Sequence, residues 1–141
     1  MNYQEVISFV RENPVCAIAT TEGDQPRVRL FLAVLFDGDD RIYFSTGSMK
    51  KVHAQIVANK KIELCFWKPD YSLTLRITGN IEIVDDRAKK QKLLDEREYL
   101  KAFNSNADDP RFVLLRVPHG SASYWSMESN MREGEADVVT F

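Results

Sequence analysis

Two arginines, Arg27 and Arg29, are the first residues along the chain whose type and spacing point to chemistry. They stand two positions apart in residues 27–36, which we expect to form a strand, and alternate residues of a strand share a face. Their guanidinium groups therefore project together, opposite Val28 and Leu30. Paired guanidinium groups offer forked donors that suit a phosphate. A solvated strand face held by salt bridges is the alternative interpretation.

A second candidate anion site lies in residues 45–51, which read Ser-Thr-Gly-Ser-Met-Lys-Lys. This segment follows an expected strand and opens an expected helix, with Ser48 as the cap. Free N–H groups and the positive end of the helix dipole favour an anion there. Lys50 and Lys51 add charge of the same sign as that dipole, so together they indicate an anion that neutralises them. An exposed, capped helix start is the alternative, and the G-x-x-x-x-G-K pattern of a nucleoside-triphosphate loop is missing.

Short strands joined by turns must position these residues. The hydrophobic pattern predicts a helix after Asn2 and further helices from about residue 50 to 59 and, capped by Asp85, to about residue 101. Strands are predicted over residues 15–20, 27–36, 41–45, 62–67, 72–84, 112–117 and 121–125. Gly79 interrupts the fifth of these and indicates a bend. Residues 104–110 are predicted to be a loop, residues 126–137 irregular, and residues 138–141 a final edge strand.

The predicted fold class is mostly β with α insertions, an antiparallel barrel of six or seven strands. A doubly wound parallel fold needs a helix after nearly every strand, and the first three strands leave no room for one. With 141 residues, of which 44% are hydrophobic, the chain suits one domain over residues 1–141.

Composition excludes several classes of function. The formal net charge of −2 argues against a nucleic-acid binder driven by bulk charge. No apolar run approaches the roughly 20 residues of a membrane span, and the first residues lack the pattern of a secretory signal, so we expect a cytoplasmic protein. Cys16 and Cys65 are expected to be reduced and buried in strands. No His/Cys cluster has the spacing of a metal site.

Several motifs in order resemble a known family. They read IAT, PRVRLF, IYFSTGSMKK, VHAQIVANKKIELCFW and LRITGNIEIVDD. Their order and spacing, from about residue 9 to residue 125, resemble the pyridoxamine-phosphate-oxidase-like FMN-binding split barrels. The resemblance implies a split β-barrel fold and FMN as the cofactor.

The resemblance also assigns roles to individual residues. It gives contacts with the FMN phosphate or ribityl chain to four cations, Arg27, Arg29, Lys50 and Lys51. It places the backbone of Val28 and Leu30 near the flavin. It lines the isoalloxazine or ribityl chain with Ser45 and Thr46. In that family the other subunit of a homodimer completes the site, and Trp125 or its neighbours would supply this contact.

The chain departs from true pyridoxamine-phosphate oxidases at its C-terminal end, which lacks an extension rich in Arg, Pro and Trp. Oxidation of vitamin B6 is therefore not expected, whereas FMN binding is. We expect an FMN-dependent oxidoreductase that carries out two-electron redox chemistry on a small molecule. A non-catalytic flavin carrier and a haem-handling split barrel, for which His119 would matter, are the alternatives. No side chain stands out as a general acid or base, and His53 is expected to lie on the surface.

Overall fold

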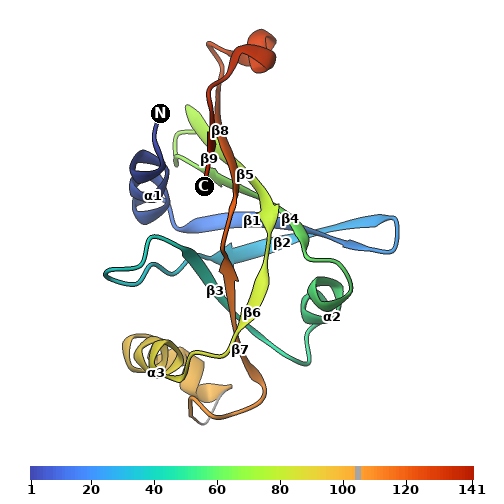
Figure 1. Cartoon of the computed structure of the whole chain (residues 1–141), viewed down its shortest axis with the longest axis vertical. Helices are drawn as coiled ribbons and strands as arrows, with labels where there is room; N and C mark the ends of the chain where they lie inside the picture. The colour runs from blue at the N-terminus through green and yellow to red at the C-terminus, as the bar shows by residue number, and fades with distance from the viewer. Residues whose placement is uncertain (104–105) are drawn as a thin grey trace.

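Two antiparallel sheets form the frame of the protein, whose computed structural model describes residues 1–103 and 106–141. The larger sheet has the strand order β2-β1-β4-β5-β8-β9, and the smaller has the order β3-β7-β6 (Figure 1). The strands are β1 (Val15–Glu22), β2 (Gln25–Leu32), β3 (Ile42–Gly47), β4 (Lys61–Trp67), β5 (Leu73–Asn80), β6 (Glu82–Val84), β7 (Phe112–Val117), β8 (Gly120–Ser126) and β9 (Val138–Thr140). The predicted fold class is confirmed, with nine strands in the described residues rather than six or seven.

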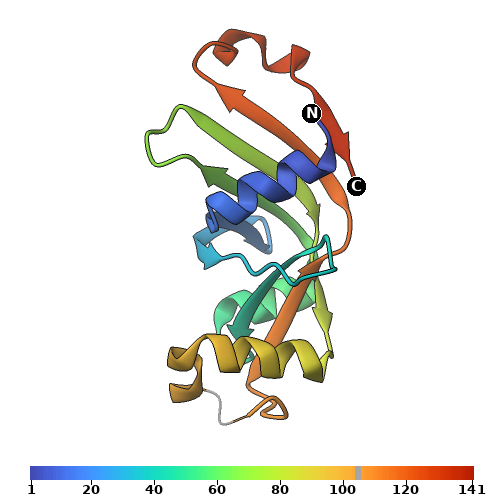
Figure 2. The same ribbon diagram turned by 90° about the vertical axis from the view of Figure 1, so that its left-hand side faces the viewer.

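The described residues also form three α-helices and two short 3-10 helices. Figure 2 shows how these helices lie around the sheets. They are α1 (Tyr3–Glu12), α2 (Lys51–Ala58), α3 (Arg87–Glu96), η1 (Glu98–Ala102) and η2 (Asn130–Glu135). The first helix begins as predicted, because Asn2 and Glu5 form a capping box in which each side chain accepts the other residue's backbone N–H. None of the helices in the described residues is long and apolar enough to cross a bilayer.

The small sheet has its central strand, β7, buried on both faces. One face joins the main core, where Phe44 and Leu115 meet residues of α1, α2 and the large sheet. The other face is covered by α3, whose Leu93 and Leu94 pack near Tyr43. Strand β7 is accordingly an almost continuous apolar run, because both of its faces lie against other elements.

The predicted strand over residues 72–84 divides into β5 and β6, which belong to different sheets. The predicted bend at Gly79 explains the division. Gly79 lies opposite Gly120 of β8, and a Cβ built at Gly79 would stand only 2.8 Å from the carbonyl oxygen of His119. Only glycine lets the backbones of β5 and β8 approach this closely. The chain therefore crosses from the large sheet to the small sheet beside the pair of Gly79 and Gly120.

Three other local predictions are wrong. Ser48 does not cap α2, because Lys50 is the N-cap residue, without a side-chain cap hydrogen bond. Asp86, rather than Asp85, caps α3 by accepting the backbone N–H of Lys89 at 3.0 Å. Residues 126–137 are not irregular throughout, since they contain η2. Of the predicted loop over residues 104–110, residues 104–105 lie outside the described residues.

The two cysteines are free, but they differ in burial. Cys16 faces the main core, and burial first, then the neighbouring Cys65, raises the pKa of its thiol to about 12. Cys65 is only half-buried, so its predicted burial is wrong. The reason is strand alternation, which places Leu64 and Phe66 in the core and turns Cys65 to the outer face of the large sheet.

Candidate cofactor-binding site

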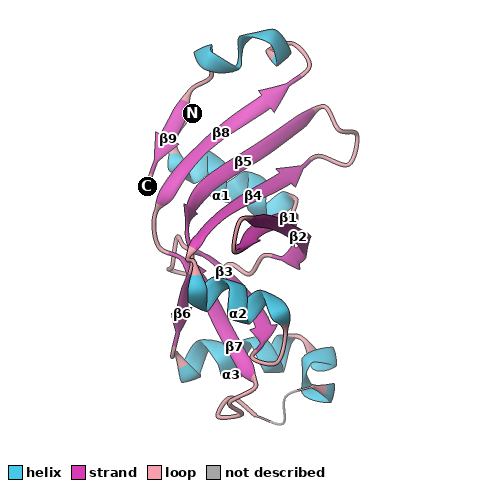
Figure 3. Cartoon of the chain, turned by 90° about the vertical axis from the view of Figure 1, so that its right-hand side faces the viewer, coloured by secondary structure: helices cyan, strands magenta, loops and turns pink. Residues whose placement is uncertain are grey.

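Two adjoining hollows are lined by residues of β2, the end of β3 and the start of α2. Figure 3 shows the ribbons of these elements. The larger, which we call the large groove, has a volume of about 920 Å³, and the smaller, the side pocket, has about 360 Å³. Arg29, Lys50 and Val52 line both. The large groove lies near the top of the roughly 300–1,000 Å³ range of small-molecule sites.

Eight of the nine residues singled out from the sequence line these hollows. The large groove takes Arg29, Leu30, Ser45, Thr46 and Lys50, and the side pocket takes Arg27, Val28, Arg29, Lys50 and Lys51. Two segments that are separated in the sequence are therefore brought together by the fold. The ninth residue, Trp125, lies on β8 and lines neither hollow.

Arg29 is held firmly between β1 and α2. One terminal nitrogen donates to Thr20 Oγ1 at 2.7 Å and to the carbonyl of Ile18 at 3.3 Å, and the other donates to Gln55 Oε1 at 2.6 Å. All of these acceptors are neutral, so they fix the guanidinium without cancelling its charge. Burial first, and then the nearby charge of Arg27, lower the pKa of Arg29. Both effects disfavour the charged form of Arg29, and an anion beside the guanidinium would offset them, so the position favours a bound anion.

A single carboxylate, Glu22, lines the side pocket. It accepts from Arg27 at 3.1 Å and from the Gln55 amide at 3.2 Å. These two hydrogen bonds and the charge of Arg27, in that order, outweigh a small cost of burial and lower the pKa of Glu22, with a further contribution from Lys51. Four cations therefore surround this pocket against one acid, and the balance favours a phosphate-like anion.

The start of α2 adds to this positive field. Lys50 and Lys51 are exposed, and the first turn of the helix contains no acidic residue. The first N–H groups of a helix have no partner within it, and they carry the positive end of the dipole. Lys50 and Lys51 line the side pocket together with Arg29, so the helix start adds two cations to the one that β2 supplies.

Thr46 supplies an independent sign of a ligand. Its residue is 7% exposed, and its Oγ1 is the one fully buried side-chain polar atom without a hydrogen-bond partner among the described residues. A buried hydroxyl without a partner is costly, of the order of 1–3 kcal/mol. Thr46 lines the large groove, and a rotation about its Cα–Cβ bond would turn the covered Oγ1 toward a polar ligand there.

Sequence reasoning missed the far wall of the large groove. This wall includes Arg97, Tyr99, Lys101 and Phe103 around η1, and Arg111 just before β7. They were missed because they follow the site segments by about fifty residues or more, with no spacing pattern of their own. Gln55 was also missed, although a polar residue between the buried Val52 and Ile56 is a detectable signal on a helix.

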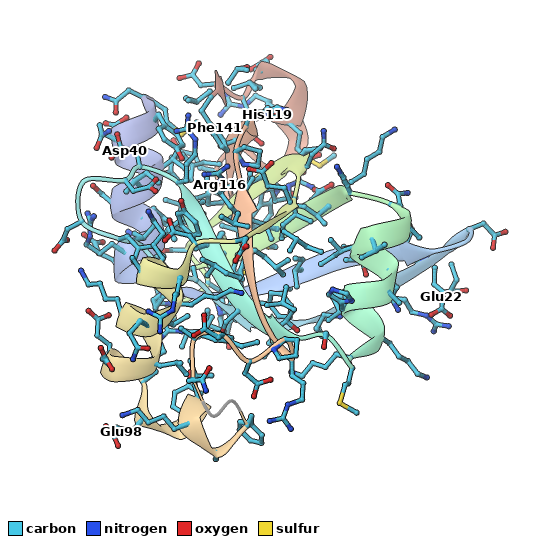
Figure 4. All side chains as sticks on the ribbon, turned by 60° about the horizontal axis from the view of Figure 1, so that its bottom comes forward. Glu22, Asp40, Glu98, Arg116, His119 and Phe141 are labelled. Carbon is cyan, nitrogen blue, oxygen red and sulfur yellow. The ribbon has the colours of Figure 1, made fainter. Side chains whose placement is uncertain are left out.

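Neither histidine lines the two hollows. His53 stands in the first turn of α2, two residues after Lys51, and it is half-buried rather than fully exposed. His119 is exposed in the turn between β7 and β8. Figure 4 places His119 beside Phe141 and well away from Glu22, the carboxylate of the side pocket. In the described residues, no group of three or more His, Cys, Asp or Glu residues is arranged to hold a metal ion.

The fold and the site together define a protein of two antiparallel sheets with a cationic, phosphate-suited groove between β2, β3 and α2. The family model for pyridoxamine 5'-phosphate oxidase matches residues 3–126, and the chain therefore belongs to that family. The predicted family is thereby confirmed. No curated protein sequence is a significant match.

Solved structures share the fold over almost the whole chain. A NimC/NimA family protein from Clostridium acetobutylicum has 26% identity and a TM-score of 0.80, with 99% of this chain and 93% of that one covered. A pyridoxamine 5'-phosphate oxidase-related, FMN-binding protein from Nostoc punctiforme has 14% identity and a TM-score of 0.66, with 98% and 95% covered. A heme-binding protein from Mycobacterium smegmatis has 13% identity and a TM-score of 0.73, with 98% of this chain but 57% of that one covered.

Proposed function

We propose that this chain binds FMN in the side pocket and at the end of the large groove nearest Arg29 and Lys50, and works as an FMN-dependent oxidoreductase on a small molecule. The observation that carries the proposal is the convergence of Arg27, Arg29, Lys50 and Lys51 on two adjoining hollows that contain one acidic lining residue. The unpartnered Oγ1 of Thr46 in the same groove supports it. The FMN-binding protein of the same fold from Nostoc punctiforme supports the choice of ligand.

Each lining segment has a distinct task in this proposal. Arg29 and the start of α2 bind the phosphate, because Arg29 is fixed by neutral partners and keeps its charge available. Arg27 is partly neutralised by Glu22 and acts as a second, weaker cation. Ser45 and Thr46 offer hydroxyls to the polar part of the cofactor, and the β2 backbone at Val28 and Leu30 lies along it.

FMN supplies the two-electron chemistry when it is bound. The residues of the chain position it, exclude water on the side of the main core, and set the electrostatic field around it. No carboxylate lines the large groove among the described residues, so every charged side chain in its lining is a cation. A positive field favours the reduced, anionic form of a bound redox group and therefore raises its reduction potential.

A homodimer completes this site in the proposal. β2 is an edge strand, and its outward side chains Val28, Leu30 and Leu32 are 69%, 64% and 38% exposed. An exposed apolar edge of this kind is typical of an interface. Trp125 lies on the same outer face of the sheet as Leu30. The row of cross-strand neighbours that starts at Leu30 passes through Cys65 and reaches Ser123 on β8. Trp125 stands two residues after Ser123, and residues two apart on a strand share a face. A second copy covering this face would bury Trp125 as well.

The proposal includes a cytoplasmic location and one domain over residues 1–141. A flavin carrier without catalysis has the same binding site, and turnover alone separates it from an enzyme. Haem handling is less well supported, because His119 lies outside both hollows.

Identification of the co-purifying ligand tests the proposal. The purified protein, reconstituted with FMN if needed, should show the absorption bands of a flavin and release FMN on denaturation. FMN should bind far more tightly than riboflavin, which lacks the phosphate. Equal affinity for the two would contradict a phosphate site at the start of α2, and a haem spectrum would favour the alternative.

A further inference from the structure

The large groove has two different ends, one at Arg29 and Lys50, where we propose that the FMN phosphate binds, and one at η1. Five cationic residues line the groove, namely Arg29, Lys50, Arg97, Lys101 and Arg111. The first two also line the side pocket, at the end where the FMN phosphate is proposed to bind. The other three come from η1 and its approach, and from the loop before β7, so the groove has a second cationic end.

The three cations at the second end are not equivalent. Arg111 makes a two-pronged ion pair with the buried Asp109, with distances of 2.7 and 3.1 Å, and its charge is cancelled. Lys101 pairs with Glu98 at 3.1 Å. Arg97 instead donates to the carbonyl of Ala33 at 3.3 Å, and no carboxylate of the described residues pairs with it. Arg97 is therefore anchored but not neutralised, as Arg29 is at the other end.

Exposed aromatic surface lies beside Arg97. Tyr99 and Phe103 line the same groove, and they are 56% and 69% exposed. Neither ring stacks on another ring among the described residues. Large aromatic side chains contribute most of the apolar area of small-molecule sites, and they prefer to lie against planar rings.

We propose that the η1 end of the large groove binds the second substrate, and that this substrate is a small aromatic carboxylate. This rests on the proposed function, since the substrate would lie next to the FMN held at the other end. Arg97 offers a forked pair of donors that matches a carboxylate. Tyr99 and Phe103 cover the ring of the ligand. A neutral aromatic ligand would lack the ion pair with Arg97, and a small aliphatic acid would lack the packing against Tyr99 and Phe103.

The test uses FMN-loaded protein, with 2-naphthoate as the probe and 2-naphthamide as its neutral counterpart of the same shape. Calorimetry measures both dissociation constants, and FMN affinity is measured for every variant. In the wild type, naphthoate should bind at least about tenfold more tightly than naphthamide, the preference that one charge-assisted hydrogen bond gives. Arg97→Gln should remove most of that preference and leave FMN affinity unchanged.

Two further variants separate charge from packing. Lys92→Gln removes one positive charge from an exposed position on α3 that does not line the groove, and it should preserve the preference. Tyr99→Ala should weaken naphthoate and naphthamide alike, by about two- to tenfold. Arg97→Lys keeps the charge but loses the fork, so it should retain part of the preference.

Distinct outcomes overturn distinct claims. Equal binding of the two probes to wild type, or an unchanged preference in Arg97→Gln, refutes the carboxylate site while FMN binding stands. A changed sedimentation mass in Arg97→Gln, with an unchanged preference, shows instead that η1 is a contact between copies. If the wild type does not bind FMN, the proposed function fails, and the probe preference of the apo-protein then tests the η1 end alone.

Discussion

Replacing Lys50 and Lys51 with alanine should weaken FMN binding far more than it weakens the fold. Both lysines are exposed, so each interaction with a phosphate is partly screened by water. We take about 1 kcal/mol per lysine as the screened value and about 3 kcal/mol as the upper value for a charge-assisted hydrogen bond. Two lysines then contribute about 2–6 kcal/mol, or about thirtyfold to twenty-thousandfold in the dissociation constant of FMN.

The apo-protein should not lose stability in the same variant. Lys50 is the N-cap residue but makes no side-chain cap, so no cap hydrogen bond is lost. Both lysines oppose the dipole of α2, and removing a charge of the same sign gains about 0.3–1 kcal/mol for each. The apo variant should therefore melt at or slightly above the temperature of the apo wild type, as followed by circular dichroism.

The chain provides a matched control for this experiment. Lys60 and Lys61 are also adjacent and exposed, and they follow the other end of α2 without lining either hollow. Lys60→Ala/Lys61→Ala changes the net charge equally and should leave FMN affinity within a few-fold of wild type. Riboflavin should bind both double variants and the wild type with similar affinity. If FMN affinity is the same in all three proteins, the reasoning about the helix start is refuted.

Four further predictions test other parts of the argument. Thr46→Val removes a buried hydroxyl without a partner, so the apo-protein should be at least as stable, while FMN affinity falls about two- to tenfold in a titration. Leu30→Glu places a charge on the exposed apolar face of an edge strand, and sedimentation should show the loss of a dimer; a wild-type protein that is already monomeric at micromolar concentration would contradict this. At pH 8 a thiol reagent should modify Cys65 much faster than Cys16, whose pKa is raised to about 12 by burial, and a Cys65→Ser variant should then label very slowly. Asp86→Ala should lower the free energy of unfolding by about 1 kcal/mol at pH 7, because the hydrogen bond from the helix backbone lowers the pKa of Asp86 and stabilises its charged form. That stabilisation is present above the unfolded pKa of about 3.9 and is lost as the pH falls through the lower folded pKa. The denaturation curves of wild type and variant should therefore converge in strong acid.

The mostly β fold could be predicted because local patterns are strong. Alternation along β5 placed Leu75 and Ile77 in the core, as the structure has them. Tight turns between the first strands excluded a parallel sheet. Two arginines spaced two apart and two lysines at a helix start are equally local features, and they were sufficient to propose a phosphate site. The family resemblance then added the hydroxyls and the β2 backbone.

Only the tertiary structure decided which of these groups meet and in what state of charge. The partners of Arg29 come from β1 and α2, so a neutral environment for its guanidinium is invisible in the sequence around it. The unpartnered hydroxyl of Thr46 is likewise a property of packing. Arg97 and Tyr99 reach the groove because the fold brings η1 to the hollow that β2 and β3 also line, more than forty residues away in the chain. Side-chain types and the two-residue period of a strand can be read from short stretches of sequence. Pairing, burial and charge compensation depend on contacts between distant segments, and those contacts exist only in the folded chain.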